Sequence, residues 1–233
     1  MKQIIKNYLK KVNYFQEEYK KTQIVLHHTE TTGWRSPFKW WSRKGNHVAT
    51  AYIIDKDGTI IECFDPKHWA YNTGLGAKYD KHNIGIELVN EGYLRCTNED
   101  EGRFKYRGKY NYKYKIGFSP KVLTEEWRGH KYFAKYTTEQ IKSTFELVKK
   151  LCNDFDIRTF IAPKHIYNEQ LRNFRGIITH ANVKQNKTDI SPAFPIEGLD
   201  GYLEFGKKKK IEIPKVNWFE SLINLIFSFF SKK

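Results

Sequence analysis

The sequence has few cysteines and no long apolar stretch near its start. Its 233 residues include only Cys63, Cys96 and Cys152, which lie far apart and form no Cys-x-x-Cys pair. An odd and scattered set argues against a disulfide framework and against a cysteine-rich zinc site. The basic first 15 residues lack the apolar core of a secretory signal. We therefore expect a chain that is cytoplasmic at synthesis, or exported by a route not written at its N-terminus.

Acidic residues are outnumbered, with 26 Asp and Glu against 41 Lys and Arg, and the formal net charge is +15. This charge implies an anionic partner or surface, such as nucleic acid, anionic lipid or an acidic polymer like bacterial cell wall. No nucleic-acid-binding motif accompanies it, so we expect no nucleic-acid partner. Hydrophobic residues make up 39% of the chain, which suits a soluble domain with a sizeable core.

Local patterns predict an α/β domain with a central mixed sheet flanked by helices. β-branched residues predict a buried strand at 24–29, and two apolar runs on either side of a turn predict a hairpin over 47–64. The hairpin turn falls at Asp57-Gly58, a pair that favours a type I′ turn. Further short strands are expected within 82–92 and 175–183. Residues 31–46 are expected to form a loop or a short helix.

A helix is predicted over 138–153. Thr137 and Gln140 have the spacing of a capping box. The apolar residues that recur at the spacing of one helical face are Ile141, Phe145, Val148 and Cys152.

Composition divides the chain into three parts. A Lys-rich lead-in, 1–22, precedes a domain over 23–200, and a basic linker with an apolar helix follows over 201–233. Within the domain, 93–136 is a basic and aromatic insertion that forms either a solvated hairpin or a lip over a groove. The helix at 216–231 is too short to span a bilayer and either docks on protein or lies on a membrane surface.

Three places in the sequence offer zinc ligands. They are the pair His27-His28 at a strand end, His180 after another apolar run, and Asp189 nine residues later. Two histidines and a carboxylate with an open fourth position form a normal catalytic zinc set, which acidifies a bound water and polarises a carbonyl. Side chains alternate along a strand, so only one histidine of the pair faces a groove, and alternation alone does not say which.

Two charged residues accompany these ligands. Glu87 interrupts an apolar strand, where a carboxylate is costly unless it is paired or used. It is either a salt-bridge partner or the group that moves a proton from water to a leaving amine. Lys187 is either an ordinary solvated lysine or a cation that stabilises an oxyanion.

The ordered set "IVLHHT", "ATAYIIDKDGTI", "HWAYNTG", "NIGIELVNEG" and "ITHANV…NKTDISPAFP" resembles the zinc-dependent N-acetylmuramoyl-L-alanine amidases. The resemblance covers about residues 20–198. It implies one Zn²⁺ in an open groove and cleavage of the amide between N-acetylmuramic acid and L-alanine in peptidoglycan. It implies His27, His180 and Asp189 as metal ligands. It assigns catalysis to Glu87 and Lys187, and substrate contacts to Trp69, Asn72 and Asn83.

Three positions depart from the family pattern. Asp189 is followed by Ile190-Ser191-Pro192 in place of Pro-Gly-Pro, and the loop around Asn72 differs from the usual Ala-Trp-His-Ala-Gly. A tyrosine that assists catalysis in some phage members falls near Thr50, so this chain relies on Glu87.

The resemblance places the ligand of the doublet at His27 and makes His28 a packing residue.

The resemblance leaves three roles open. The chain is a phage-type endolysin that acts on the wall after release, a cytosolic muropeptide-recycling amidase, or a non-catalytic peptidoglycan-binding module. The charge and the apolar tail favour the endolysin. We expect a monomer. Contact with a membrane surface is one of the two roles open to 216–231.

Overall fold

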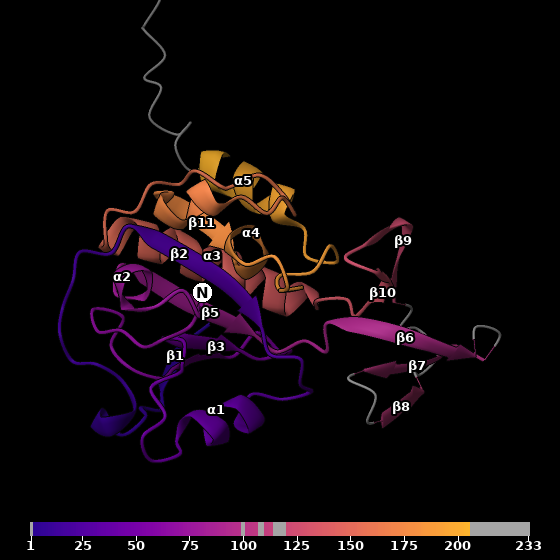
Figure 1. The fold of residues 1–233 in the computed structure, drawn as a ribbon, viewed down its shortest axis with the longest axis horizontal. Coiled ribbons are helices and arrows are strands. Elements are labelled where there is room, and N and C mark those ends of the chain that lie inside the picture. Colours follow the sequence, from indigo (N-terminus) through magenta and orange to yellow (C-terminus); the bar gives the residue numbers. More distant parts are fainter. Residues whose placement is uncertain (1, 99–100, 107–109, 114–119, 206–233) are drawn as a thin grey trace, which may run out of the picture. The chain divides into compact units, whose positions relative to one another are not determined.

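A six-stranded mixed sheet forms the centre of the computed structural model, which describes residues 2–98, 101–106, 110–113 and 120–205 (Figure 1). Its strand order is β1-β4-β3-β5-β2-β11. The strands are β1 (Ile4–Lys6), β2 (Gln23–His28), β3 (Tyr52–Ile54), β4 (Ile60–Glu62), β5 (Asn83–Leu88) and β11 (Gly176–Thr179). β3, β5, β2 and β11 are parallel, whereas β4 runs antiparallel to β3. The predicted mixed sheet is therefore confirmed.

Helix α3 (Thr138–Asp154) packs its apolar face against one side of this sheet. Leu147 and Leu151 share a core cluster there with Leu26 of β2 and Ile86 of β5. The Thr137 side chain caps the helix by accepting a hydrogen bond from the Gln140 backbone. The Gln140 side chain does not complete the capping box, because it donates to backbone carbonyls of the sheet region instead.

The buried face of α3 is turned slightly from the predicted one. Val148 and Cys152 are buried as expected, but Ile141 and Phe145 are only half-buried, and Thr144 is buried in their place. Short polar side chains enter this interface because their hydroxyls find acceptors, as Thr144 does on its own helix. Tertiary contacts therefore select a face that the apolar spacing alone misses.

The remaining helices are short. They are α1 (Arg35–Trp41), α2 (Ala77–Asp80), α4 (His180–Val183), α5 (Ile196–Phe205) and the 3-10 turns η1 (Lys11–Asn13) and η2 (Glu169–Asn173). Among the described residues, no helix has the length and apolar character needed to cross a bilayer. The predicted apolar helix at 216–231 and most of the linker lie outside the described residues.

The segment 1–22, expected as a lead-in, adds structure to the domain. β1 pairs in parallel with β4 at the edge of the central sheet, and Leu9 and Tyr14 enter its core cluster. Lys21 is buried and donates to the backbone oxygens of His68 and Lys81. One compact unit accordingly extends over Met1–Leu203, and Glu204–Lys233 forms a second unit, of which only the last two residues of α5 are described.

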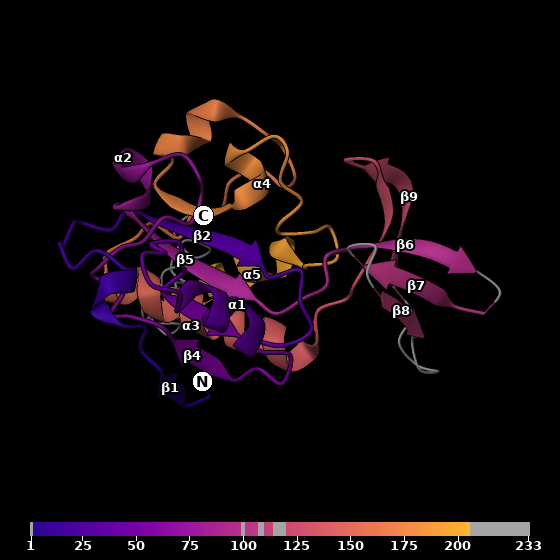
Figure 2. The ribbon, with the colours of Figure 1, turned by 60° about the horizontal axis from the view of Figure 1, so that its bottom comes forward.

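The basic and aromatic segment 93–136 folds as a second, antiparallel sheet of five strands (Figures 1 and 2). The strand order is β8-β7-β6-β10-β9. The strands are β6 (Tyr93–Asn98), β7 (Arg103–Tyr106), β8 (Tyr110–Lys113), β9 (Lys121–Trp127) and β10 (His130–Phe133). Leu94, Phe104 and Ala134 form a small core of its own. The segment is thus larger than the expected hairpin.

One hairpin in each sheet has a short turn that can be compared with the predicted turn type. At the predicted type I′ pair, only Gly58 has a positive φ, +81°, so the Asp57-Gly58 turn is not type I′. The two-residue type I′ turn occurs instead at Arg128-Gly129, between β9 and β10, where both φ angles are positive, +52° and +76°.

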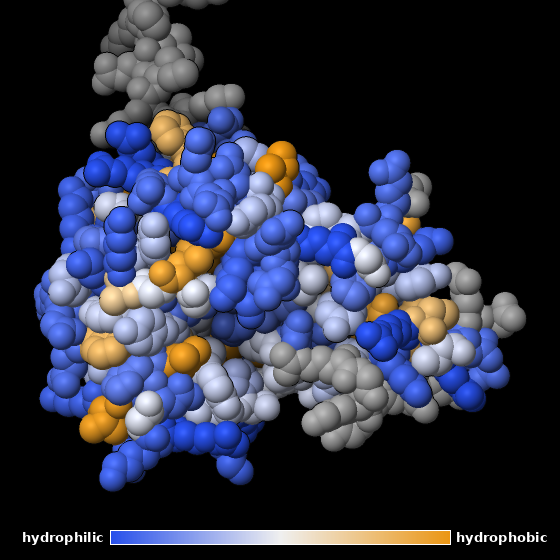
Figure 3. All heavy atoms as spheres, viewed as in Figure 1, coloured by the Kyte–Doolittle hydropathy of each residue, from blue (hydrophilic) through white to orange (hydrophobic). Residues whose placement is uncertain are grey.

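On the face seen in Figure 3, hydrophobic residues lie as small groups among hydrophilic ones.

Candidate active site

The site lies where three parallel strands end. The C-terminal ends of parallel strands meet at one edge of a sheet, and ligands commonly bind there. His27 near the end of β2 is in register with Glu87 of β5. On the other side of β2, Leu26 is in register with Thr179 of β11, so His180 follows at the level of His27. The strand register alone therefore brings these three residues together.

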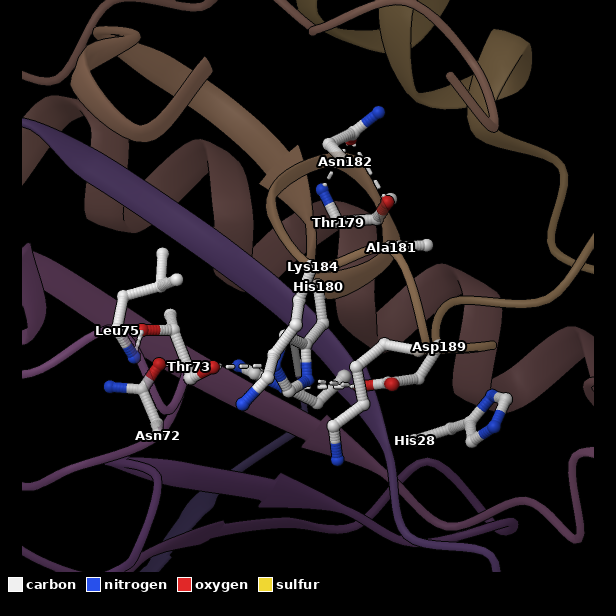
Figure 4. Close-up of polar contacts among 12 residues, drawn as sticks. His28, Asn72, Thr73, Leu75, Thr179, His180, Ala181, Asn182, Lys184 and Asp189 are labelled. Carbon is white, nitrogen blue, oxygen red and sulfur yellow. Dashed lines mark hydrogen bonds and ion pairs between the residues drawn. The ribbon is translucent and has the colours of Figure 1, made fainter. Parts of the chain in front are cut away.

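His27, His180 and Asp189 form a buried cluster that can hold a metal ion. The Nδ1 atoms of the two histidines are 3.1 Å apart. Oδ2 of Asp189 is 3.1 Å from Nδ1 of His27 and 2.9 Å from Nδ1 of His180. Figure 4 shows His180 and Asp189 pointing toward one another, with Thr73 on the far side of the imidazole. Burial alone would raise the pKa of Asp189, but the adjacent His180 and His27 hold it well below its usual range.

The outer nitrogen of each imidazole faces an oxygen. Nε2 of His27 lies 3.2 Å from Oδ1 of Asn72, and Nε2 of His180 lies 2.9 Å from the carbonyl oxygen of Thr73. Both oxygens are acceptors, so each Nε2 donates to its oxygen, and each Nδ1 is left to offer a lone pair when a cation is bound. Two lone pairs and the Asp189 carboxylate then converge on one point. This donor set fits a cation, and nitrogen with carboxylate oxygen is a set that Zn²⁺ takes.

Asp80 connects Asn72 and Thr73, the outer partners of the two histidines. This fully buried carboxylate accepts hydrogen bonds from the Thr73 hydroxyl, at 2.5 Å, and from the Asn83 amide, at 3.3 Å. Asn83 in turn accepts from the Asn72 amide at 2.8 Å, which turns the Asn72 oxygen toward the ligand histidine. Outer partners of this kind orient metal ligands and strengthen binding. Thr73 and Asp80 were not among the predicted site residues, because nothing in their spacing connects them to the distant ligands.

Glu87 and Lys187 line the cavity that opens onto the cluster. The cavity has a volume of about 640 Å³ and also borders Trp40 and Trp41 of α1. Burial raises the pKa of Glu87 to about 7, against the lowering effect of His27 and Lys187. A carboxyl group with a pKa near neutrality is suited to accept and return a proton.

The His28 ring is directed away from His180 and Asp189, as Figure 4 shows. It is buried, and its Nδ1 lies 2.9 Å from the hydroxyl of Tyr136. Burial lowers the pKa of His28, which disfavours the charged form of the ring. The doublet thus contains one residue of the cluster and one residue of the core.

Two of the three expected substrate contacts lie elsewhere. Trp69 is buried against Phe15, with ring centroids 4.0 Å apart, and its indole donates to Glu17. The N-terminal segment supplies both partners, and a large aromatic ring gains more from this burial than from exposure. Asn83 is buried behind Asn72. Of the three, Asn72 lines the cavity.

A mixed sheet, a buried His–His–Asp cluster and a neighbouring carboxyl group with a raised pKa define a class: a hydrolytic enzyme whose site can hold a metal ion. The family model of N-acetylmuramoyl-L-alanine amidases matches residues 18–192. The chain belongs to this family, as the resemblance implied, and it is an amidase of that class. Among curated proteins, no relative matches.

Two solved structures, of AmiD and of AmpD, share the fold. AmiD from E. coli, in complex with the substrate anhydro-N-acetylmuramic acid-L-Ala-D-gamma-Glu-L-Lys, is 20% identical with a TM-score of 0.53, over 80% of this chain and 59% of that one. A selenomethionine derivative of AmpD is 13% identical with a TM-score of 0.50, over 87% and 96% of the two chains. LysC from Clostridium intestinale is 17% identical with a TM-score of 0.49, over 88% and 99%.

Proposed function

We propose that this chain is a zinc-dependent amidase that cuts the bond between N-acetylmuramic acid and L-alanine in peptidoglycan. The observation that carries the proposal is the convergence of two Nδ1 lone pairs and the Asp189 carboxylate, each imidazole being held from behind by an acceptor. When bound there, zinc would polarise the scissile carbonyl and acidify a water. The AmiD complex, which shares the fold, holds a substrate of this chemistry.

The protein's own residues supply the remaining chemistry. Glu87, with its pKa near 7, accepts a proton from the attacking water and passes it to the leaving amine of L-alanine. Lys187 lines the same cavity and supplies a positive charge where the oxyanion develops. Asn72 contacts His27 from the cavity wall and is the expected substrate contact that remains.

The endolysin role is the one that the composition supports best. A formal net charge of +15 favours association with an anionic cell wall. We therefore propose that the chain is made in the cytoplasm and acts on the wall after release, as a monomer. Contact of 216–231 with a membrane surface remains part of this proposal.

The proposal is tested with the full-length protein and Glu87→Gln. Zinc content is measured by elemental analysis, and stem peptides released from purified peptidoglycan are measured by mass spectrometry. We expect about one zinc per chain in both proteins and peptide release from the wild type alone. Glu125→Gln, which changes an exposed carboxylate on β9, is the matched control and should keep full activity.

The two alternative functions predict different results. A non-catalytic binding module would pull down peptidoglycan and release no peptides. A recycling amidase would cleave soluble muropeptides and leave intact peptidoglycan uncut. New glycan reducing ends without free peptides, from a protein without zinc, would refute the amidase assignment.

A further inference from the structure

Arg128, at the tip of the second sheet, binds the loop that carries Lys187 and Asp189. One guanidinium nitrogen of Arg128 donates to the carbonyl oxygens of Lys184, at 3.2 Å, and Lys187. The other donates to the carbonyl oxygen of Ala181 at 2.8 Å. These carbonyls belong to α4 and to the loop after it, at the end of a helix where the last backbone oxygens lack partners within the helix. The Lys184 carbonyl also accepts from the Lys187 backbone, at 3.2 Å. One side chain therefore satisfies three acceptors on the segment between two residues of the cluster.

The turn that presents this side chain is unusual for an arginine. Arg128 is the first central residue of a type I′ turn and has a φ of +52°. Asn, Asp and Gly are strongly preferred there, because other side chains crowd the backbone in this conformation. An arginine gains nothing from the turn itself. Its contacts with the loop supply a reason for its presence.

Neighbouring contacts hold the guanidinium in place. The Trp127 ring lies beneath it, 4.9 Å from its central carbon. Trp127 also packs on His165, with ring centroids 5.0 Å apart, and its indole donates to the His165 carbonyl at 3.4 Å. The hairpin tip is thus anchored on the main domain by an aromatic pair as well as by Arg128.

We propose that Arg128 is a positioning residue, through which the second sheet holds the 184–189 loop so that Lys187 and Asp189 face the cavity. The contacts use two guanidinium nitrogens, one for Lys184 and Lys187 and one for Ala181, a spread that the single nitrogen of an ammonium group does not provide. The inference rests on the proposed function in one respect, since it treats Asp189 as a metal ligand. It gives the segment 93–136 a role at the active site.

Arg128→Asn is the decisive variant, because asparagine suits the type I′ turn and lacks the guanidinium. Arg128→Lys keeps the charge without the fork. Arg103→Gln, which changes an exposed arginine paired with Glu101 on the same sheet, is the matched control. All variants are made in the full-length chain. Zinc affinity is measured by competition with a chromophoric chelator, and the metal-free proteins are compared by thermal melting.

Limited trypsin digestion supplies a second readout that needs no metal. Release of the loop should speed cleavage after Lys184 and Lys187, which mass spectrometry detects. For Arg128→Asn we expect about tenfold weaker zinc binding, as for other outer-shell losses, faster cleavage at these two sites, and a melting temperature close to that of the wild type. Arg128→Lys should have a zinc affinity and a cleavage rate between those of the wild type and Arg128→Asn. Arg103→Gln should match the wild type in both.

The outcomes separate the two proposals. If Arg128→Asn binds zinc as tightly as the wild type and is cleaved at the same rate, the positioning role is refuted. A variant that only melts earlier, with zinc affinity and loop cleavage unchanged, refutes it too, since that result shows a purely structural contact. If Arg128→Asn does not fold, Arg128→Lys decides by the same criteria. If the wild type binds no zinc, the proposed function fails, and the cleavage rates still test Arg128.

Discussion

Replacing Glu87 with glutamine should stabilise the metal-free protein at alkaline pH, although it removes the proposed proton carrier. Burial raises the pKa of Glu87 from 4.5 to about 7 in the folded state. Between these values the folded protein holds a proton that the unfolded chain has released. The free energy of unfolding therefore falls as pH rises from about 4.5 to about 7 and is level above this window. Glutamine stays neutral and has no such loss.

The size of the effect follows from the shift. At about 1.4 kcal/mol per pKa unit, the shift corresponds to about 3 kcal/mol. The carboxyl group faces an open cavity, where solvent screens its charge, so we expect a gain of about 1–3 kcal/mol for Glu87→Gln at pH 8. At pH 5 the wild-type carboxyl group is largely protonated, and the two proteins should differ little.

Urea unfolding of chelator-treated wild type and Glu87→Gln at pH 5 and pH 8 measures this difference. Other titrating groups, including the buried His28, change stability in both proteins alike, so the comparison at each pH isolates Glu87. Glu125→Gln is again the control and should show no pH-dependent gain. An equal stability difference between wild type and Glu87→Gln at both pH values would refute the reasoning.

Three more substitutions test the surroundings of the cluster. Asp80→Asn should weaken zinc binding about tenfold, because the Thr73 hydroxyl loses a charged acceptor; chelator competition measures this, and an unchanged affinity would contradict the outer role of Asp80. Lys187→Met should lower kcat for peptide release by about 10²–10³ with zinc content unchanged; an effect on KM alone would point to substrate binding instead. Tyr136→Phe should lower the free energy of unfolding by about 1–3 kcal/mol, because Nδ1 of the buried His28 loses its partner; equal urea midpoints would show that this bond contributes nothing.

Local signals predicted most elements of the main domain. The Thr137 cap begins α3 at the expected residue, and the hairpin at β3 and β4 forms where the two apolar runs predict it. The predicted turn type at Asp57-Gly58 was wrong, because glycine with a positive φ also occurs in turns other than type I′. The five strands within 93–136 were not foreseen, since basic and aromatic residues alternate without a clear boundary between strands.

The same contrast holds at the site. Alternation along a strand requires that His27 and His28 face opposite sides of the sheet, and this follows from the sequence alone. Which side holds the cluster depends on where β11 and β5 pair with β2, and the structure places His27 beside His180 and Asp189. Trp69 shows the limit of a motif: it was expected in the groove, but its place depends on Phe15, which the motif does not include.

The sequence by itself determined the family and the order of the apolar runs that form the strands. It also identified His27, His180 and Asp189 as candidate ligands, with Glu87 as the candidate proton carrier. These features depend on residue type and short spacing, which a sequence displays directly. Only the tertiary structure decided that Asp80 holds both outer partners of the cluster and that Arg128 binds the loop before Asp189. The Arg128–Ala181 bond joins residues 53 positions apart, and the outer partners Asn72 and Thr73 lie 45 and 107 positions from His27 and His180. Long-range pairs of this kind leave no periodic pattern along the chain.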